Sequence, residues 1–163
     1  MKNLDHVVLA GGCFWGLEDL LSKLRGVEDT EVGYAGGDFD DPSYDDIKTG
    51  KTGHAESVKI FYDKEVISLA EIFHYFFKIH DPTTLNRQGN DIGDQYRSTI
   101  LVKNDEEISV AKKVIDEVNE LGRFSDSVKT TVEKNFRYYK AEEFHQKYLQ
   151  KNPGGYSCHF ERD

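Results

Sequence analysis

The sequence predicts an α+β fold: a two-layer α/β sandwich with a ferredoxin-like core, in which helices pack against a mixed sheet. The order of the expected elements mixes strands and helices without strict alternation, which disfavours a doubly wound parallel sheet. The chain has 163 residues, of which 37% are hydrophobic and 12% aromatic, enough for a sizeable core. It contains no visible internal repeat or low-complexity segment. We therefore expect residues 1–163 to form a single domain, with a flexible tail from about residue 152.

The first expected strand leads into a glycine-rich turn that carries a cysteine. Residues 6–10 are an apolar run typical of a short buried strand, and residues 16–24 place leucines at helical spacing. Cys13 lies between them, directly after Gly11 and Gly12, so we expect it at the start of a helix. Unpaired backbone N–H groups and the helix dipole favour an anion there, so the thiolate should form readily. An inert, buried core cysteine is the alternative.

A polar stretch follows the second expected strand. Residues 32–37 are typical of a strand that gives way to a loop, and residues 38–53 have the Asp, Gly, Ser and Thr content of a loop. Tyr44 lies inside this stretch. An exposed, inert tyrosine is the alternative to a functional one at this position.

The next strand, residues 53–62, carries a carboxylate on its apolar face. Alternation places Glu56 on the same face as Val58, Ile60 and Tyr62. Partial burial would disfavour the charged form of Glu56, raise its pKa and make it a proton donor near neutral pH. The alternative is a frayed strand end with Glu56 in water.

The second half of the chain begins with a predicted capping box. Ser68 and Glu71 fit that motif and start a helix that we expect to run to about His80. The expected inner face of this helix consists of Leu69, Ile72, Phe73, Phe76 and Ile79. A polar loop with two glycines, residues 87–97, then enters a strand at residues 98–102, and such loops often hold binding residues.

Three further elements are expected before the tail. Apolar residues at helical spacing predict a helix that ends at Leu121, with Gly122 as its terminator. Alternation over residues 128–132 predicts a strand, and residues 141–150 predict a last helix. The sequence Asn-Pro-Gly-Gly at residues 152–155 then predicts a flexible hinge.

Charge and hydropathy exclude two classes of partner. The net charge of −9 argues against binding nucleic acid through a general phosphate footprint. No window approaches the roughly 18 uninterrupted apolar residues of a membrane span. The first six residues run directly into the first strand and leave no room for a signal peptide, so a cytoplasmic location is expected. Nothing in the sequence demands more than a monomer.

Two cysteines lie near opposite ends of the chain, Cys13 and Cys158. In a reducing cytosol a permanent disulfide is disfavoured, whereas a transient catalytic one is allowed. A zinc site that also uses His54 and His159 competes with this interpretation, but the chain has no C-x-x-C or H-x-x-x-H pairing. A cysteine hydrolase, with His54 or His145 as the base for Cys13, is the alternative enzyme.

With these residues identified, the chain resembles the A-type peptide methionine sulfoxide reductases, the family that acts on the S epimer. Gly-Cys-Phe-Trp-Gly at residues 12–16 is similar to the family's active-site signature, and Gly-His-Ala-Glu at residues 53–56 to its second motif. The third motif resembles residues 87–98. The resemblance covers residues 5 to about 156, and it implies the α+β sandwich that the element order favours.

The resemblance also implies a role for individual residues. Cys13 matches the nucleophile and Glu56 the acid that faces the sulfoxide oxygen. The other matched positions surround the substrate: Phe14 and Trp15 at the pocket for its methyl group, Tyr44 and Tyr96 as hydroxyl donors to its oxygen, and Asp91 as a further polar residue of the pocket.

Sulfoxide reduction needs a soft nucleophile at sulfur and a proton at oxygen, which a thiolate and a neutral carboxylic acid supply. Attack would leave Cys13 as a sulfenic acid, which we expect Cys158 to convert to a disulfide that thioredoxin or a similar dithiol reduces. No further cofactor or metal is expected. The expected substrates are oxidised proteins and peptides and free methionine sulfoxide. Direct reduction of the sulfenic acid by an external thiol, and a module that only binds oxidised methionine, are the alternatives.

Overall fold

The computed structural model describes residues 4–155, 159 and 160. Its main feature is a curled six-stranded mixed sheet with strand order β7-β6-β1-β3-β2-β8. Only β6 and β7 pair in parallel, and the other neighbours are antiparallel. The strands of this sheet are β1 (Leu4–Gly11), β2 (Val27–Ala35), β3 (Ala55–Asp63), β6 (Ser98–Val102), β7 (Thr131–Lys134) and β8 (Tyr138–Lys140).

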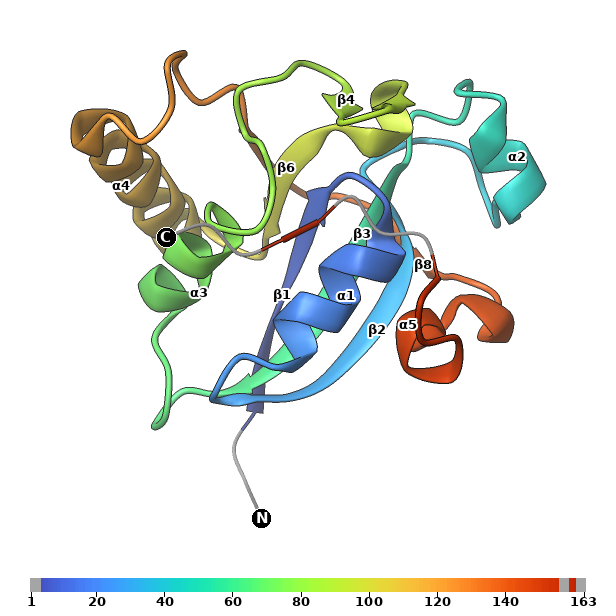
Figure 1. Ribbon diagram of the computed structural model, residues 1–163, viewed down its shortest axis with the longest axis horizontal. Helices are drawn as coiled ribbons and strands as arrows, with labels where there is room; N and C mark the ends of the chain where they lie inside the picture. The colour runs from blue at the N-terminus through green and yellow to red at the C-terminus, as the bar shows by residue number, and fades with distance from the viewer. Residues whose placement is uncertain (1–3, 156–158, 161–163) are drawn as a thin grey trace.

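The central four strands and two helices form the predicted ferredoxin-like core. Strands β1, β2, β3 and β6, with α1 (Phe14–Ser22) and α3 (Leu69–Phe76) between them, follow the order βαββαβ. Figure 1 shows α1 crossing the central strands, with α3 beside it and the long α4 (Asp105–Leu121) next to α3. The predicted α+β class, a mixed sheet with helices packed against it, is confirmed.

The hydrophobic core lies between the sheet and these helices. Alternate residues of the strands point into it, together with the buried faces of α1, α3 and α4, since each element hides one apolar side. Its fully buried side chains include Leu9, Phe14, Leu17, Tyr34, Ile60, Phe73, Phe76 and Ile100. The expected burial of Glu56 on the face of Val58 and Ile60 is confirmed, since all three are buried.

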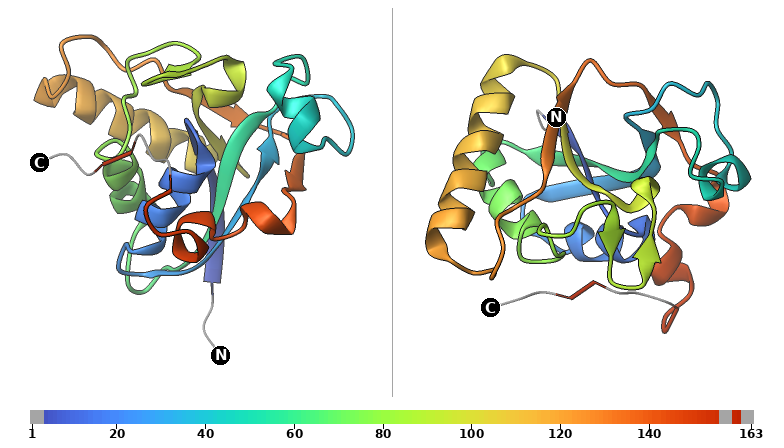
Figure 2. Two further views of the ribbon diagram at one scale, coloured as in Figure 1. Left: turned by 45° about the vertical axis from the view of Figure 1, so that its right-hand side comes forward. Right: turned by 90° about the horizontal axis from the view of Figure 1, so that it is seen from above.

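The opposite face of the sheet has a smaller apolar cluster. Small side chains such as Ala10, Ala35 and Ala55 lie there, and Phe136 and Tyr138 pack against them. The segment that leads into β8 therefore covers part of this second face (Figure 2). Within the described ranges, none of the helices is long and apolar enough to span a bilayer.

Several predicted boundaries are confirmed by local hydrogen bonds. The capping box is present, since the Ser68 hydroxyl accepts from the Glu71 N–H and the Glu71 carboxylate accepts from the Ser68 N–H. The strand at residues 98–102 has the predicted bounds. Gly122 ends α4 in the left-handed region at φ 64°. The predicted helix to about His80 ends earlier, at Phe76.

Other expectations are wrong. The loop predicted over residues 38–53 contains a short helix, α2 (Tyr44–Lys48), which Ser43 and Asp46 cap. The helix predicted over residues 141–150 is two short pieces, η2 (Glu143–His145) and α5 (Tyr148–Lys151), because Lys147 between them is left-handed at φ 53°. Strand β8 was not predicted, and the strand expected over residues 128–132 begins only at Thr131.

Candidate functional site

Cys13 lies where β1 ends and α1 begins, as the glycine pattern predicts. It is the N-cap residue of α1 with an extended backbone and is 8% exposed. Gly12 has φ +92°, and a Cβ there would come within 2.6 Å of the Gln88 side chain. Only glycine fits that turn. As the N-cap residue, Cys13 lies at the positive end of the α1 dipole, which favours the thiolate anion.

Glu56 is joined to this turn by a hydrogen bond. The backbone N–H of Phe14, the residue after Cys13, donates to Glu56 Oε1 at 3.3 Å. The residue is 2% exposed. Burial raises the pKa of Glu56 to about 8, with a contribution from the Asp91 charge and against the lowering effect of the Phe14 N–H. The side chain thus holds a proton at neutral pH, as expected for a buried acid.

Two phenols lie within the electrostatic field of the same groups. Burial first, and then the charges of Glu56, Cys13 and Asp91, raise the pKa of Tyr44 to about 12. Burial and the same charges, Glu56 first, also raise the pKa of Tyr96. Both hydroxyls therefore remain protonated donors. The structure brings together Cys13, Tyr44, Glu56, Asp91 and Tyr96, which come from four separate segments of the chain.

Those segments differ in structure. Tyr44 starts α2, and Asp91 lies in β5 (Asp91–Ile92), which forms a small two-stranded sheet with β4 (Arg87–Gln88). Tyr96 ends the short helix η1 (Asp94–Tyr96). The polar loop with its glycines thus brings two of the predicted site residues to the end of β1 and β3, as expected for a binding loop.

The aromatic residues that follow Cys13 lie at different depths. Phe14 is fully buried and packs 5.1 Å from the His145 ring and 5.8 Å from the Tyr34 ring, measured between ring centroids. Trp15 is half-buried and stacks on Tyr148, with centroids 3.8 Å apart and planes within 12°. Trp15 therefore presents the more accessible surface of the pair.

Sequence reasoning missed one carboxylate near the site. Glu142 accepts from the Tyr34 hydroxyl at 2.8 Å and from the Tyr44 backbone N–H at 2.9 Å. It thereby fixes the start of α2, which carries the Tyr44 ring. No local pattern points to this role, since Glu142 and Tyr44 are 98 residues apart in the sequence.

The two histidines considered as bases for a hydrolase have other partners. Gly37 N–H donates to His54 Nδ1 at 3.0 Å, and His54 Nε2 lies 2.7 Å from the Phe39 carbonyl oxygen. His145 Nδ1 accepts from Trp15 Nε1, and its Nε2 is buried without a hydrogen-bond partner in the part of the chain that the structure describes. Neither ring is hydrogen-bonded to Cys13. The other predicted cysteine, Cys158, lies outside the described residues.

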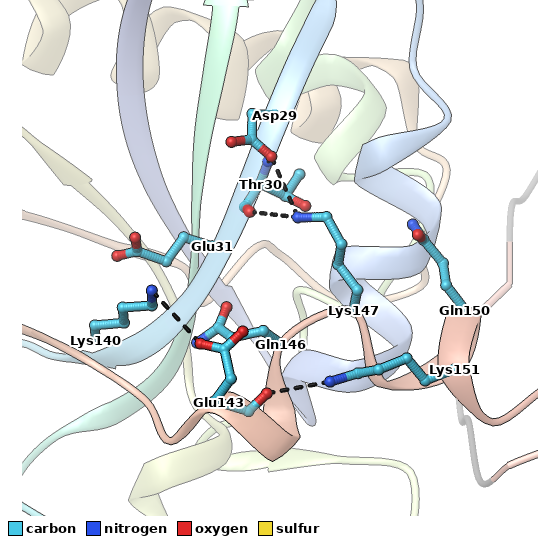
Figure 3. Close-up of a pocket in the computed structure, with 9 residues that line it drawn as sticks. All are labelled: Asp29, Thr30, Glu31, Lys140, Glu143, Gln146, Lys147, Gln150 and Lys151. Atoms are coloured by element: carbon cyan, nitrogen blue, oxygen red, sulfur yellow. Dashed lines mark hydrogen bonds and ion pairs between the residues drawn. The ribbon is translucent and has the colours of Figure 1, made fainter.

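A groove of about 440 Å³ lies elsewhere, at the edge formed by β2 and β8. Figure 3 shows its lining, in which acidic and basic side chains largely contact one another. Lys147 Nζ is 3.2 Å from Asp29 Oδ1, and Lys140 Nζ is 3.7 Å from Glu143 Oε2. Among the described residues, the charged side chains of this groove are thus largely paired within the protein.

Comparisons with known proteins identify the family of this chain. A family model described as "Peptide methionine sulfoxide reductase" matches residues 5–163. A relative from Methanothermobacter thermautotrophicus, "Peptide methionine sulfoxide reductase MsrA", is 45% identical over 153 residues, which cover 94% of this chain and 90% of the relative.

Solved structures with the same fold include Mxr1 from Saccharomyces cerevisiae. Its reduced form matches with a TM-score of 0.91 at 39% identity and covers 99% of this chain and 93% of that one. Mxr1 in complex with Trx2 matches with a TM-score of 0.67 at 28% identity and covers 99% and 91%. The resemblance found in the sequence is thus confirmed, and the chain belongs to the peptide methionine sulfoxide reductase family, whose members are thiol-dependent oxidoreductases.

Proposed function

We propose that this chain reduces the S epimer of methionine sulfoxide to methionine, in proteins and peptides and as the free amino acid, with Cys13 as nucleophile and Glu56 as acid. One observation carries the proposal. Glu56 is 2% exposed, its pKa is raised to about 8, and its carboxyl group accepts a hydrogen bond from the N–H of the residue after Cys13. This bond to the residue next to Cys13 supports the assignment of Glu56 as the proton donor and Cys13 as the nucleophile.

The chemical step transfers one oxygen atom. The Cys13 thiolate attacks the sulfoxide sulfur while Glu56 gives its proton to the sulfoxide oxygen. The substrate's S–O bond breaks, the oxygen ends on Cys13 as a sulfenic acid, and methionine leaves. The substrate gains two electrons and Cys13 loses two. Tyr44 and Tyr96 donate hydrogen bonds to the oxygen as its negative charge grows.

Substrate recognition rests on the aromatic residues and Asp91. A sulfoxide sulfur is partly positive, and its S-methyl group packs well on aromatic faces. We assign the accessible surface of this pocket to Trp15 and its buried floor to Phe14. The Asp91 charge contributes to the raised pKa of Glu56 and so helps to keep the acid protonated.

The recycling step uses the second cysteine. The Cys158 thiol attacks the Cys13 sulfenic acid, water leaves, and a disulfide forms that thioredoxin reduces. Two observations support this step. His159, the residue after Cys158, donates to the Gly11 carbonyl oxygen at 2.6 Å, two residues before Cys13. The related Mxr1 has been solved in complex with Trx2. The cycle needs one chain and a reducing compartment such as the cytoplasm.

A single-turnover experiment tests the proposal. Reduced enzyme without added reductant is mixed with excess N-acetylated methionine S-sulfoxide amide, and product and protein mass are measured. The wild type should form about one equivalent of product and lose two hydrogens. Cys158→Ser should also form one equivalent but gain one oxygen, and Cys13→Ser should form none. Equal yield from the R epimer would contradict the assigned stereochemistry, and no product from either epimer would overturn the function.

A further inference from the structure

We infer that Glu142 is a positioning residue for the reaction: its carboxylate ties the start of α2 to a core tyrosine and so sets where the Tyr44 hydroxyl lies relative to Glu56. The inference rests on the proposed function, because it assigns how one of the proposed donors to the sulfoxide oxygen is held. Glu142 lies outside the three sequence motifs and is 98 positions away from Tyr44.

The helix that carries Tyr44 is too short to fix its own first residue. A helix of five residues is unstable by itself in water, so α2 depends on contacts at its ends. Its capping box satisfies the backbone N–H groups of Ser43 and Asp46. The N–H of Tyr44 is not part of the box, and it donates to Glu142 Oε2 at 2.9 Å. The carboxylate thus supplies, from a distant segment, an acceptor that the local sequence does not provide.

The other oxygen of the Glu142 carboxylate is bonded to the core. Tyr34, a fully buried residue of β2, donates its hydroxyl to Glu142 Oε1 at 2.8 Å. Burial and this hydrogen bond raise the pKa of Tyr34, so the hydroxyl keeps the proton that it donates. Tyr34 is also the partner of Glu56 in the antiparallel register of β2 and β3. A short series of contacts therefore leads from the strand position of the proposed acid to the backbone of the proposed donor.

The charged form of Glu142, which serves both contacts, is the form present at neutral pH. Burial alone would raise the pKa of Glu142, but the N–H groups of Tyr44 and of Glu142 itself and the Tyr34 hydroxyl lower it below its ordinary value. A charged acceptor also makes stronger hydrogen bonds than a neutral one. Glu142 thus offers one carboxylate oxygen to each of its two partners.

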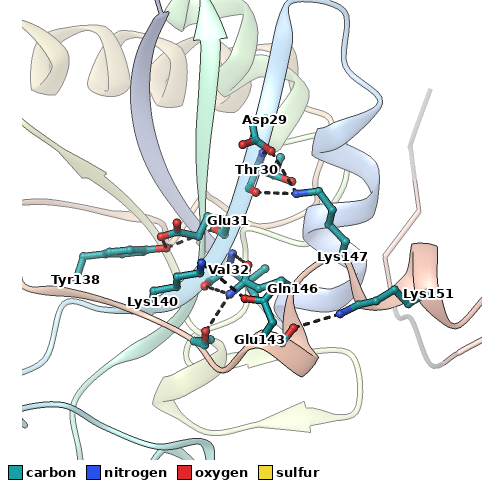
Figure 4. Close-up of polar contacts among 11 residues, drawn as sticks. Asp29, Thr30, Glu31, Val32, Tyr138, Lys140, Glu143, Gln146, Lys147 and Lys151 are labelled. Carbon is teal, nitrogen blue, oxygen red and sulfur yellow. Dashed lines mark hydrogen bonds and ion pairs between the residues drawn. The ribbon is translucent and has the colours of Figure 1, made fainter.

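The segment that carries Glu142 is itself fixed to the sheet. Directly before Glu142, the Ala141 N–H donates to the Val32 carbonyl oxygen at 3.0 Å. After it, the Gln146 side chain accepts from the Val32 N–H at 2.8 Å and donates to the carbonyl oxygens of Val32 and Ala141 at 2.9 and 3.0 Å. Figure 4 shows this amide inserted against strand β2. Because the chain is held on both sides of Glu142, its carboxylate is a fixed point for α2.

A small movement of the Tyr44 backbone is expected to change the rate. Without Glu142 the first turn of α2 can shift, and the Tyr44 hydroxyl moves away from the sulfoxide oxygen. Misplacing a group by about 1 Å can cost about 100-fold in rate. We expect a smaller loss, because two contacts of the Tyr44 ring remain: the His145 ring at 4.5 Å and Lys48 Nζ at 5.0 Å, both measured to the ring centroid.

Matched substitutions separate this role from a general effect of charge. Glu142→Ala removes both acceptor oxygens. Glu142→Gln keeps one oxygen for the Tyr44 N–H and turns its amide N–H toward the Tyr34 hydroxyl, which can accept. Glu143→Ala is the control, because Glu143 is an exposed neighbour that lies 3.7 Å from Lys140 Nζ (Figure 4). If Glu142→Ala does not fold, Tyr34→Phe replaces it, with smaller expected effects in the same direction.

The first readout is hydrogen exchange of the Tyr44 amide, measured by NMR and independent of activity. We expect this amide to exchange at least about tenfold faster in Glu142→Ala than in wild type, because its acceptor is lost. Glu142→Gln and Glu143→Ala should stay within about threefold of wild type. Exchange at the wild-type rate in Glu142→Ala would overturn the inference.

The second readout is the single-turnover reaction with N-acetylated methionine S-sulfoxide amide. We expect the limiting rate to fall about 5- to 30-fold in Glu142→Ala, with the half-saturating concentration changed less than about threefold, because the Tyr44 hydroxyl acts on the developing oxygen charge. Glu142→Gln should stay within about threefold of wild type on both. An unchanged limiting rate in Glu142→Ala, or an equal loss in Glu143→Ala, would overturn the inference. Failure of the proposed function looks different, since wild type itself would then form no methionine.

A double-substitution cycle completes the test. Tyr44→Phe keeps the ring and the backbone N–H but lacks the hydroxyl, so adding Glu142→Ala to it should slow the reaction by less than about twofold. If the two effects multiply instead, Glu142 acts independently of the Tyr44 hydroxyl and the inference is wrong.

Discussion

Glu18 and Glu56 are the two most deeply buried glutamates of the described residues, and their surroundings differ. Glu18 in α1 is 1% exposed and Glu56 in β3 is 2% exposed. Glu18 accepts two short hydrogen bonds, from the Thr30 hydroxyl at 2.8 Å and from the Lys147 N–H at 2.7 Å. Glu56 accepts one longer bond, from the Phe14 N–H at 3.3 Å.

The difference shows that burial alone does not identify an acid. Burial raises the pKa of both carboxyl groups. Around Glu18 the Thr30 hydroxyl, the Lys147 N–H and the Lys147 charge all stabilise the carboxylate, whereas the charge next to Glu56 is the carboxylate Asp91, which disfavours it. Glu18 thus ties α1 to β2 and to the residue before α5, while Glu56 keeps a proton to give away.

The largest expected effect separates the two glutamates by rate. Glu56→Gln should slow the single-turnover reaction by about 10²- to 10⁴-fold, because a positioned proton donor contributes that much. Glu18→Gln, a matched change at an equally buried position, should stay within about threefold of wild type. Rapid-quench measurement of methionine formation checks both. A Glu56→Gln chain with near-normal rate would remove Glu56 from the acid role.

Glu56 and Glu18 should also differ in how they make the free energy of unfolding depend on pH. The pKa of Glu56 is about 8 in the folded chain, against 4.5 as its ordinary value, so between these values the unfolded chain releases a proton that the folded chain keeps. The free energy of unfolding therefore falls as pH rises through this window, by about 1.4 kcal/mol per pH unit, and is flat above about pH 8. Roughly 5 kcal/mol is lost in total by the time Glu56 ionises.

Denaturant unfolding at about pH 5 and about pH 8 measures this loss. Glu56→Gln lacks the ionisation, so its stability relative to wild type should increase between the two pH values by roughly 3 kcal/mol. Glu18→Gln should instead be less stable than wild type at about pH 8, by about 1 kcal/mol, because a neutral amide replaces two charge-assisted hydrogen bonds with weaker ones. Equal pH dependence in wild type and Glu56→Gln would show that Glu56 is already ionised in the folded chain.

The sequence predicts Cys13 and Glu56, at the ends of their strands, because short stretches of sequence around each residue determine its position. The glycine turn places Cys13 by its own backbone requirement, and alternation along residues 53–62 assigns Glu56 to the apolar face. Antiparallel pairing of β1 with β3 then brings the two strand ends together. Short-range pattern is therefore enough to single out these two residues, whereas the pairing that brings them together is a long-range contact.

The remaining contacts depend on tertiary structure that no local pattern encodes. Residues 141–150 have the composition of one helix, but Gln146 and Lys147 bond to β2 and to Glu18 instead, which breaks the helix and directs His145 toward Trp15. The same limit applies to α2, since the polar residues around its Ser43 cap are equally typical of a loop. The recycling role of Cys158 stays a prediction, because this residue lies outside the described ranges.

The smallest expected effects concern the tyrosine hydroxyls. They separate hydroxyls that donate to the substrate from one that only supports the fold. Tyr44→Phe and Tyr96→Phe should each slow the single-turnover step by about 10- to 100-fold, because each loses one donor to the developing oxygen charge. Tyr62→Phe is the matched control. Its hydroxyl bonds to Asp5 at 3.3 Å at the far end of the same strand as Glu56, so the rate should not change. If Tyr62→Phe slowed the reaction as much as Tyr44→Phe, loss of a phenol would act through the fold and neither predicted donor would touch the substrate.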